Sequence, residues 1–280
     1  MRVACAKVDV YLELTIKEFN QIREYLKQNY GISMGDEKRM LVFSRLRSTL
    51  NQKGFNDFSQ YFDYLVRDKT GEAAVVFINK LTTNHTFFMR EAEHIEFLSN
   101  KALPWIENQF GASKDLRLWC AGCSSGEEAY TLQMAVQDHF ANKPGWNLEI
   151  LATDISERVL QQAWHGIYSV ESLKAMPPDW VKKYFRKYDE DNMVVTDEIK
   201  KLMTFRKFNL NEINFPFKKK FQVIFCRNVM IYFDNPTREA LVNRFHSVLE
   251  DGGYLFIGHS ESLSNINTPF NYVMPAAYRK

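Results

Sequence analysis

Apolar residues recur every three or four positions from about residue 15 to 110, a spacing typical of helices that bury one face. Thr15 precedes the first periodic segment and is a favourable N-cap. Gly31, Gly54 and Gly71 separate the segments, where helix ends and turns favour glycine. The pattern predicts a small helical bundle, whose apolar faces carry Ile16, Phe19, Ile22, Leu26, Phe43, Leu46, Leu50, Phe58, Tyr61, Phe62, Leu65, Val66, Val75, Val76 and Ile78.

From about residue 116 onward, short apolar runs alternate with helical segments. The predicted strands are residues 116–120, 148–152, 221–225 and 253–257, and the predicted helices are residues 127–140, 157–164 and 238–249. This alternation is typical of βαβ units and indicates an α/β fold with a parallel sheet. Residues 166–202 interrupt the rhythm with two prolines and a short alternating run, so we expect an insertion with some local β structure there.

The charge balance narrows the classes of protein that fit this pattern. The 280 residues include 36 Lys and Arg and 34 Asp and Glu, a net charge of +2 with both signs spread along the chain. Such a balance does not favour wholesale binding to nucleic acid or to a membrane surface. The apolar runs are far shorter than the ~20 residues that span a bilayer, so no membrane insertion is expected. Four cysteines are too few for a disulfide framework, which indicates a reducing cytoplasm, and nothing requires more than a monomer.

Cys120 and Cys123 form a Cys-x-x-Cys pair with three interpretations. They are half of a zinc site, a redox pair, or two small residues in a tight turn. No second pair completes a zinc site, and the six histidines lack metal-ligand spacing, so we expect no metal.

Polar residues follow three of the predicted strands, where ligands bind in open parallel sheets. Gly122 and Gly126 bracket a loop of small residues that opens a helix, and Glu127 follows at once. Glu127 either contacts a ligand or stabilises the helix N-terminus. Asp154 follows the second strand and either binds ribose hydroxyls or caps the next helix. Asn228 follows the third strand, where an amide beside an apolar residue suits a purine-like ring.

Together with a segment ahead of the sheet, these residues resemble the signatures of the chemotaxis receptor methyltransferases, the CheR family. The matching segments are residues 83–91 (TNHTFFMRE), 119–128 (WCAGCSSGEE), 152–155 (ATDI), 227–233 (RNVMIYF) and 258–262 (GHSES). The helical start is also similar, through Leu14-Thr15, Phe19, Gly31-Ile32, Lys38 and Arg45-Leu46. The resemblance spans almost the whole chain. It implies a helical domain over residues 1–88, a Rossmann-like class I methyltransferase domain over 89–280, and a small antiparallel β-subdomain at about 166–202.

The resemblance implies S-adenosylmethionine as cofactor and S-adenosylhomocysteine as product. The implied cofactor contacts are Asn84, Thr86 and Arg90 at the methionine end, Glu127 in the loop, Asp154 at the ribose, Asn228 and Val229 at the adenine, and the pair Asn209 and Leu210. Two choices stay open. Glu128 competes with Glu127, and Asn211 offers a second register for the Asn209–Leu210 pair.

The implied reaction is methyl transfer to glutamate side chains of chemoreceptors, which forms methyl esters. A free glutamate has a pKa near ~4.3 and is already ionised at neutral pH, so no general base is required. Alignment of the reacting groups and exclusion of water must supply the rate. We expect Arg90 to position the substrate carboxylate or the cofactor, and Tyr232 to donate a hydrogen bond to the same carboxylate. The structural alternatives are a salt bridge from Arg90 to Glu91 or Glu93, and a tyrosine that packs in the core.

The implied partner is the acidic, helical cytoplasmic bundle of a chemoreceptor. Lys38 and Arg45 lie seven residues apart on one predicted helix face and are candidates for binding it, although a solvated face explains them equally well. The turn at residues 188–192 lacks the glycines of family members that need a receptor tail peptide. We therefore expect an enzyme that works without this tether.

Three other functions remain as alternatives. A nucleic-acid methyltransferase would use the same sheet, but its motifs are absent and the only basic run is Lys218-Lys219-Lys220. A non-catalytic scaffold would have no reason to keep all four of Arg90, Glu127, Asp154 and Asn228. A redox protein would depend on the Cys-x-x-Cys pair.

Overall fold

The computed structural model describes residues 12–82 and 85–280, and the chain divides into two compact units, Met1–Thr83 and Asn84–Lys280. This division lies ahead of the boundary that the sequence indicates after residue 88. The buried ring of Phe88 packs edge-on against Tyr168 and Phe185, at centroid distances of 4.9 and 5.8 Å. Phe88 therefore packs within the second unit.

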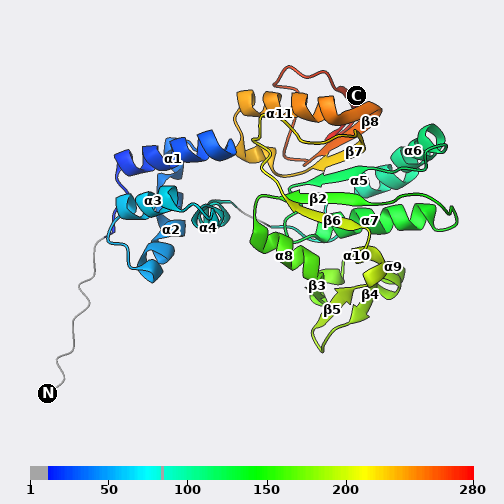
Figure 1. Ribbon diagram of the computed structural model, residues 1–280, viewed down its shortest axis with the longest axis horizontal. Coiled ribbons are helices and arrows are strands. Elements are labelled where there is room, and N and C mark those ends of the chain that lie inside the picture. The colour runs from blue at the N-terminus through cyan, green and yellow to red at the C-terminus, as the bar shows by residue number, and fades with distance from the viewer. Residues whose placement is uncertain (1–11, 83–84) are drawn as a thin grey trace. The chain divides into compact units, whose positions relative to one another are not determined.

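The first unit is the helical bundle that the periodicity predicts (Figure 1). Its elements are α1 (Ile16–Tyr30), the 3₁₀ helix η1 (Asp36–Lys38), α2 (Arg39–Lys53), α3 (Phe58–Arg67) and α4 (Glu72–Leu81). Thr15 caps α1, because its hydroxyl accepts the Glu18 N–H at 3.2 Å while the Glu18 carboxylate accepts the Thr15 N–H at 2.9 Å. Gly31 and Gly54 end α1 and α2 in the left-handed conformation, with φ of 72° and 76°.

The interior of this unit contains most of the predicted apolar faces. The buried members are Phe19, Ile22, Leu26, Leu46, Leu50, Phe58, Tyr61, Leu65 and Ile78. The prediction is wrong for Ile16, Val66 and Val76, which are 67%, 56% and 40% exposed. Val66 directly follows the buried Leu65, and the rotation of about 100° per helical residue turns its side chain toward solvent.

The second unit is built on a seven-stranded sheet with the order β6-β2-β1-β7-β8-β10-β9. The strands are β1 (Leu118–Ala121), β2 (Ile150–Asp154), β6 (Met203–Lys207), β7 (Phe221–Cys226), β8 (Leu249–Ile257), β9 (Asn271–Met274) and β10 (Ala277–Arg279). The first five strands in this order are parallel, and β10 pairs antiparallel with β8 and β9. The predicted α/β fold and its four predicted strands are confirmed, whereas the apolar pattern does not indicate β6, β9 or β10.

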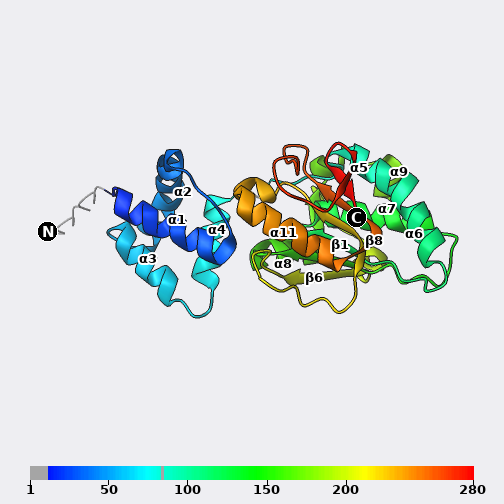
Figure 2. The same cartoon turned by 90° about the horizontal axis from the view of Figure 1, so that it is seen from above.

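Helices pack on both faces of this sheet (Figure 2). They are α5 (Ala92–Phe97), the π-helical turn η2 (Leu98–Ala102), α6 (Leu103–Phe110), α7 (Glu127–Phe140), α8 (Glu157–His165) and α11 (Asn235–Val248). Leu118 and Cys120 face the core formed with α6 and α7. Trp119 points to the opposite face, where its ring meets Phe245 of α11 at 5.4 Å. No helix among residues 12–82 and 85–280 is long and apolar enough to cross a membrane.

The insertion forms a separate three-stranded antiparallel sheet, as predicted. Its order is β3-β5-β4. Its elements are β3 (Ile167–Ser169), η3 (Glu171–Leu173), α9 (Pro178–Tyr184), β4 (Phe185–Lys187), β5 (Asn192–Val195) and α10 (Asp197–Lys200).

Candidate active site

The loops that follow β1, β2, β7 and β8 lie together at the carboxyl ends of these strands, because the strands are parallel neighbours. The chain runs from β1 to β2 on one side, whereas β7 lies on the other side of β1. Ligands of open α/β sheets bind outside the carboxyl ends of the strands at such a switch point. Glu127, Asp154, Asn228 and Val229 follow these strand ends, so the structure brings the predicted residues to one place.

Asp154, at the end of β2, holds the loop that follows β1. Its carboxylate accepts N–H bonds from Ser124 and Ser156, both at 2.9 Å. Burial raises the pKa of this carboxyl, although the backbone N–H donors oppose the shift. The capping role belongs to Ser156, whose hydroxyl accepts the Val159 N–H at 3.4 Å at the start of α8. Asp154 is therefore a carboxylate at the switch point rather than a helix cap.

Glu127 and Glu128 have different surroundings although they are adjacent. The Glu128 carboxylate forms a 2.6 Å ion pair with Arg227 and accepts a 3.3 Å bond from the Cys120 thiol. Glu127 accepts the Ser125 hydroxyl at 2.8 Å and pairs with no cation in the described part of the chain. Burial raises the pKa of Glu127. Of the two adjacent carboxylates, only Glu128 is therefore neutralised by a described cation.

Two glycines allow the loop after β7 to pack closely between its neighbours. A Cβ on Gly122, whose φ is 88°, would lie 2.5 Å from Val229 Cγ2. A Cβ on Gly258 would lie 2.4 Å from Asn228 Nδ2. Both positions therefore exclude a larger side chain, because real Cβ atoms do not approach so closely. The side chains of Asn228 and Val229 are consequently held by the loops after β8 and β1.

Arg227 joins several of these loops through a buried guanidinium. Its side chain is 2% exposed and forms ion pairs with Glu91 at 3.1 Å and Glu128 at 2.6 Å. It also donates a 2.6 Å hydrogen bond to the Arg90 carbonyl. The Glu91 carboxylate in turn accepts the His259 N–H at 3.2 Å. The segment before the sheet is thereby fixed to the loops after β1, β7 and β8, a role that the sequence did not indicate for Arg227.

Arg90 keeps its own guanidinium away from these carboxylates. It donates to the His85 carbonyl at 2.9 Å, and its Cζ lies 5.7 Å from the centre of the Phe87 ring. The alternative of a salt bridge to Glu91 or Glu93 is not observed among the described residues, because Glu91 pairs with Arg227.

Glu261 is a second residue whose role the sequence does not reveal. It lies in the GHSES segment and is only 8% exposed. Its carboxylate accepts the backbone N–H groups of Gly258 at 2.6 Å, Asn228 at 2.9 Å and Ile231 at 3.1 Å. Burial raises the pKa of this carboxyl, and the N–H donors counteract the shift. One buried carboxylate thus binds the backbone of two loops.

Several residues near the carboxyl ends of the parallel strands have strained backbone conformations. Met89, Glu91, Ser124 and Asn228 have φ of 59°, 50°, 49° and 59°, a region that costs residues other than glycine about 1 kcal/mol or more. Such conformations persist where surrounding contacts enforce them, commonly at ligand sites.

The remaining predicted residues lie in the same unit with less defined roles. Thr86 is half-buried, and Tyr232 ends the 3₁₀ helix η4 (Met230–Tyr232) with its side chain half-buried. Asn209 follows β6, and its side-chain oxygen accepts the Asn211 N–H at 3.0 Å. Leu210 is buried, and its carbonyl accepts a 3.0 Å bond from Arg244. Asn84 lies outside the described residues.

Comparison with known families decides the identity of this fold and site. Residues 84–278 match the family described as CheR methyltransferase, SAM binding domain, and residues 17–82 match the CheR methyltransferase, all-alpha domain. The chain belongs to the CheR methyltransferase family. It is accordingly an S-adenosylmethionine-dependent methyltransferase, and the class I methyltransferase fold that the sequence implies is confirmed.

Curated relatives of the CheR family agree over nearly the full length. The chain is 40% identical to the chemotaxis protein methyltransferase of Borreliella burgdorferi over 277 residues, which cover 98% of each chain. It is 36% identical to that of Salmonella typhimurium, over 93% of this chain and 88% of the relative. For Escherichia coli the identity is 34%, over 95% and 93%.

The two candidate receptor-binding residues of this CheR family member differ in their contacts. Arg45 is half-buried and donates to the Leu81 and Thr82 carbonyls at 2.8 and 3.3 Å, at the end of α4. Lys38 is exposed at the N-cap of α2. Arg45 therefore has a structural role within the bundle that the interpretation as a receptor contact did not include.

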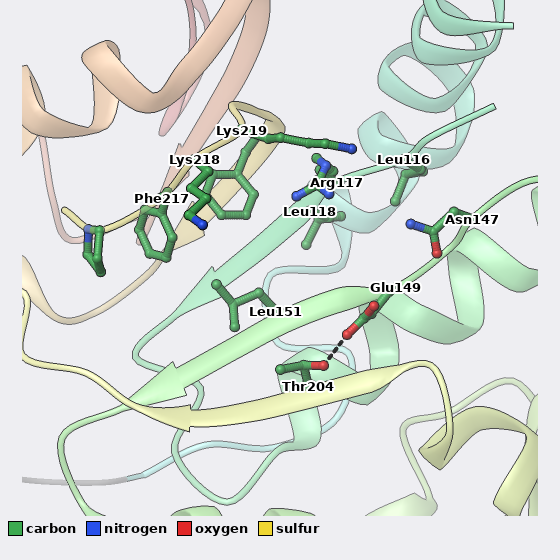
Figure 3. A pocket seen from close by; sticks show the side chains of 12 residues that line it. Leu116, Arg117, Leu118, Asn147, Glu149, Leu151, Thr204, Phe217, Lys218 and Lys219 are labelled. Atoms are coloured by element: carbon green, nitrogen blue, oxygen red, sulfur yellow. Dashed lines mark hydrogen bonds between the residues drawn. The ribbon is translucent and has the colours of Figure 1, made fainter. Parts of the chain in front are cut away.

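A hollow of about 430 Å³ lies at the opposite ends of the strands from the motif residues (Figure 3). It is lined by the starts of β1, β2, β6 and β7 together with Lys218 and Lys219 from the basic run. Asp115 pairs with Lys219 at 3.2 Å and with Arg117 at 3.0 Å, which offsets part of the positive charge. The basic run therefore lies at the end of the sheet away from the motif residues of this CheR domain.

Three cysteines of the CheR fold are buried, and two of its histidines lie beside a glutamate. Cys120, Cys123 and Cys226 are buried, and burial raises the pKa of each thiol, which favours the protonated form over the reactive thiolate. Donor atoms of Glu91, His94 and His259 lie within 4.8 Å of one another. Arg227 already pairs with this glutamate, so a metal ion would meet a buried positive charge.

Proposed function

We propose that this chain transfers methyl groups from S-adenosylmethionine to glutamate side chains of chemoreceptors and thereby forms methyl esters for sensory adaptation. The relatives' names, chemotaxis protein methyltransferases, supply the substrate class. One observation of this chain carries the site assignment. Asp154 and Glu127 are two half-buried carboxylates at the carboxyl ends of the parallel strands, and neither pairs with a cation in the described part of the chain. Carboxylates partly removed from water gain from polar partners, and the hydroxyl and ammonium groups of the cofactor would provide them.

The proposed contacts follow from these surroundings. Asp154 would hold the ribose, and Asn228 and Val229 would contact the adenine. Glu127, rather than Glu128, would contact the cofactor from the loop after β1. Asn84, Thr86 and Arg90 would hold the methionine end, with Asn209 and Leu210 along the cofactor. Bound S-adenosylmethionine supplies a methyl group on a sulfonium centre.

The chain's own contribution to the reaction is positional. The acceptor glutamate is ionised at neutral pH, so no side chain needs to remove a proton. Arg90 and Tyr232 are proposed to orient this carboxylate, with donors fixed by the surrounding loops. Arg90 makes no ion pair with any described residue, so its charge is available to a substrate carboxylate.

The test is transfer of radiolabelled methyl from S-adenosylmethionine to a purified cytoplasmic receptor fragment. A methyl ester releases its label as methanol at alkaline pH, whereas an amine or amide keeps it. We expect alkali-labile label with the wild type and none with Asp154→Ala. Alkali-stable label, or equal label with both proteins, would refute the proposal.

We further propose that the enzyme acts as a monomer in the cytoplasm and needs no receptor tail peptide. The turn between β4 and β5 is closed on itself, because Asp189 accepts the N–H groups of Asp191 and Asn192 at 2.9 and 2.8 Å. Equal methylation of receptors with and without their C-terminal tail is expected. Micromolar binding of a tail peptide would contradict the idea.

A further inference from the structure

We propose that Glu261 is a positioning residue for cofactor binding, which sets the backbone of residues 228–231 without touching the cofactor itself. The inference rests on the proposed assignment of Asn228 and Val229 to the adenine side.

The hydrogen bonds of Glu261 are directed at this one loop and at the strand end beside it. Oε2 accepts from both Asn228 and Gly258, and Oε1 accepts from Ile231. No salt bridge to Glu261 occurs among residues 12–82 and 85–280, so backbone N–H groups carry the task of stabilising the buried charge. The bond from Ile231 also satisfies an N–H group in the η4 turn, Met230–Tyr232.

The hydrogen bonds of Glu261 matter because the backbone of residues 228–231 includes a strained conformation. Asn228 has φ of 59°, and its side chain lies where a Cβ on residue 258 would be. Val229 next to it likewise occupies the space that a Cβ on residue 122 would need. The Glu261 carboxylate bonds the backbone on both sides of this contact, so it fixes which way these two side chains point. Without it, the loop can relax toward a less strained conformation that no longer presents them.

The test compares Glu261→Gln with a matched substitution. Glutamine keeps the size but replaces one oxygen with an NH₂ group that confronts backbone donors. We expect the Kd for S-adenosylhomocysteine to rise about tenfold to a hundredfold in calorimetry, the range for lost bonds to a charged acceptor. The KM for S-adenosylmethionine should rise similarly while kcat changes little. Glu261→Asp, which keeps the charge, should recover part of the affinity.

Glu18→Gln is the control. Glu18 is also a buried carboxylate that accepts backbone N–H groups, from Thr15 and Ser59, but it lies in the first unit. We expect it to lower thermal stability and to leave the Kd for S-adenosylhomocysteine unchanged.

A further variant tests the same loop in case Glu261→Gln does not fold. Gly258→Ala pushes on the Asn228 backbone nitrogen, 2.9 Å from the new Cβ, while Glu261 stays intact. It should weaken S-adenosylhomocysteine binding as well. Wild-type affinity in Glu261→Asp and Gly258→Ala, or in folded Glu261→Gln, would overturn the inference. Absence of binding by the wild type would instead refute the proposed function.

Discussion

Replacing Arg227 with glutamine tests whether the buried ion-pair network holds the second unit together. The substitution leaves Glu91 and Glu128, which are 13% and 12% exposed, without their cation. Breaking a buried pair by removing one partner costs roughly 3–5 kcal/mol. The lost bond to the Arg90 carbonyl adds about 1 kcal/mol. This total is a large share of the 5–15 kcal/mol by which domains are typically stable.

The assay is urea unfolding followed by tryptophan fluorescence. All five tryptophans, Trp105, Trp119, Trp146, Trp164 and Trp180, lie in the second unit, so the signal reports on that unit alone. We expect Arg227→Gln to lower its free energy of unfolding by about 4 kcal/mol at pH 7. Adding Glu128→Gln to the variant should recover part of the loss, because one unpaired carboxylate is then removed.

The pH dependence gives a sharper criterion. Burial alone would raise the pKa of Glu91, but the Arg227 guanidinium and the His259 N–H hold it below its usual value. Ionised Glu91 therefore stabilises the fold above its unfolded pKa of about 4.3, and this contribution is lost as the pH falls through the lowered folded value. Without Arg227, the effect of burial on the pKa of Glu91 dominates. The loss of unfolding free energy in Arg227→Gln should therefore be largest at pH 7 and shrink toward pH 4. A deficit below about 1 kcal/mol at pH 7, or one that grows on acidification, would refute the reasoning.

Four further outcomes are expected. Asp154→Ala should abolish measurable binding of S-adenosylhomocysteine in calorimetry; retained micromolar affinity would remove it from the site. Gly122→Ala must place a Cβ 2.5 Å from Val229 at φ 88°. The Kd for S-adenosylhomocysteine should therefore rise at least tenfold, and the free energy of unfolding should fall by about 1–3 kcal/mol. Because burial raises the pKa of Glu127, affinity for S-adenosylhomocysteine should fall as the pH drops through that raised value, and Glu127→Gln should flatten the profile. Arg45→Ala should destabilise the helical unit by about 1 kcal/mol in far-ultraviolet circular dichroism, with no change in tryptophan-detected unfolding.

The sequence predicted elements well where one physical signal dominated. The helix α7 begins and ends at the predicted residues, Glu127 and Phe140, because a glycine loop precedes it and a long buried face follows. The strand β6 carries no such signal, since Met203–Lys207 is a partly exposed edge strand whose last two residues are charged. An edge strand buries only part of its surface, so its pattern is weak.

The candidate site was predictable as a set of strand-end residues, but not as a network. Asn228 could be assigned to the carboxyl end of a strand, because the strand before it is apolar and the motif follows that strand directly. That Glu261 binds its backbone depends on how the loops after β7 and β8 meet in space, thirty-three residues apart in sequence. Arg45 likewise looked like a surface cation because the carbonyls it bonds belong to another helix, thirty-six residues away.

The position of β10 in the sheet has a consequence for how the second unit assembles. Residues 277–279 lie between β8 and β9, so a strand that is late in the sequence is an interior strand of the sheet. During synthesis, β8 can pair with β7, but its other edge stays open until residues beyond 277 have left the ribosome. An open edge of this kind is a template for pairing with other chains. A nascent or truncated chain that lacks these few residues should therefore be prone to aggregation, even though every proposed active-site residue has already been made.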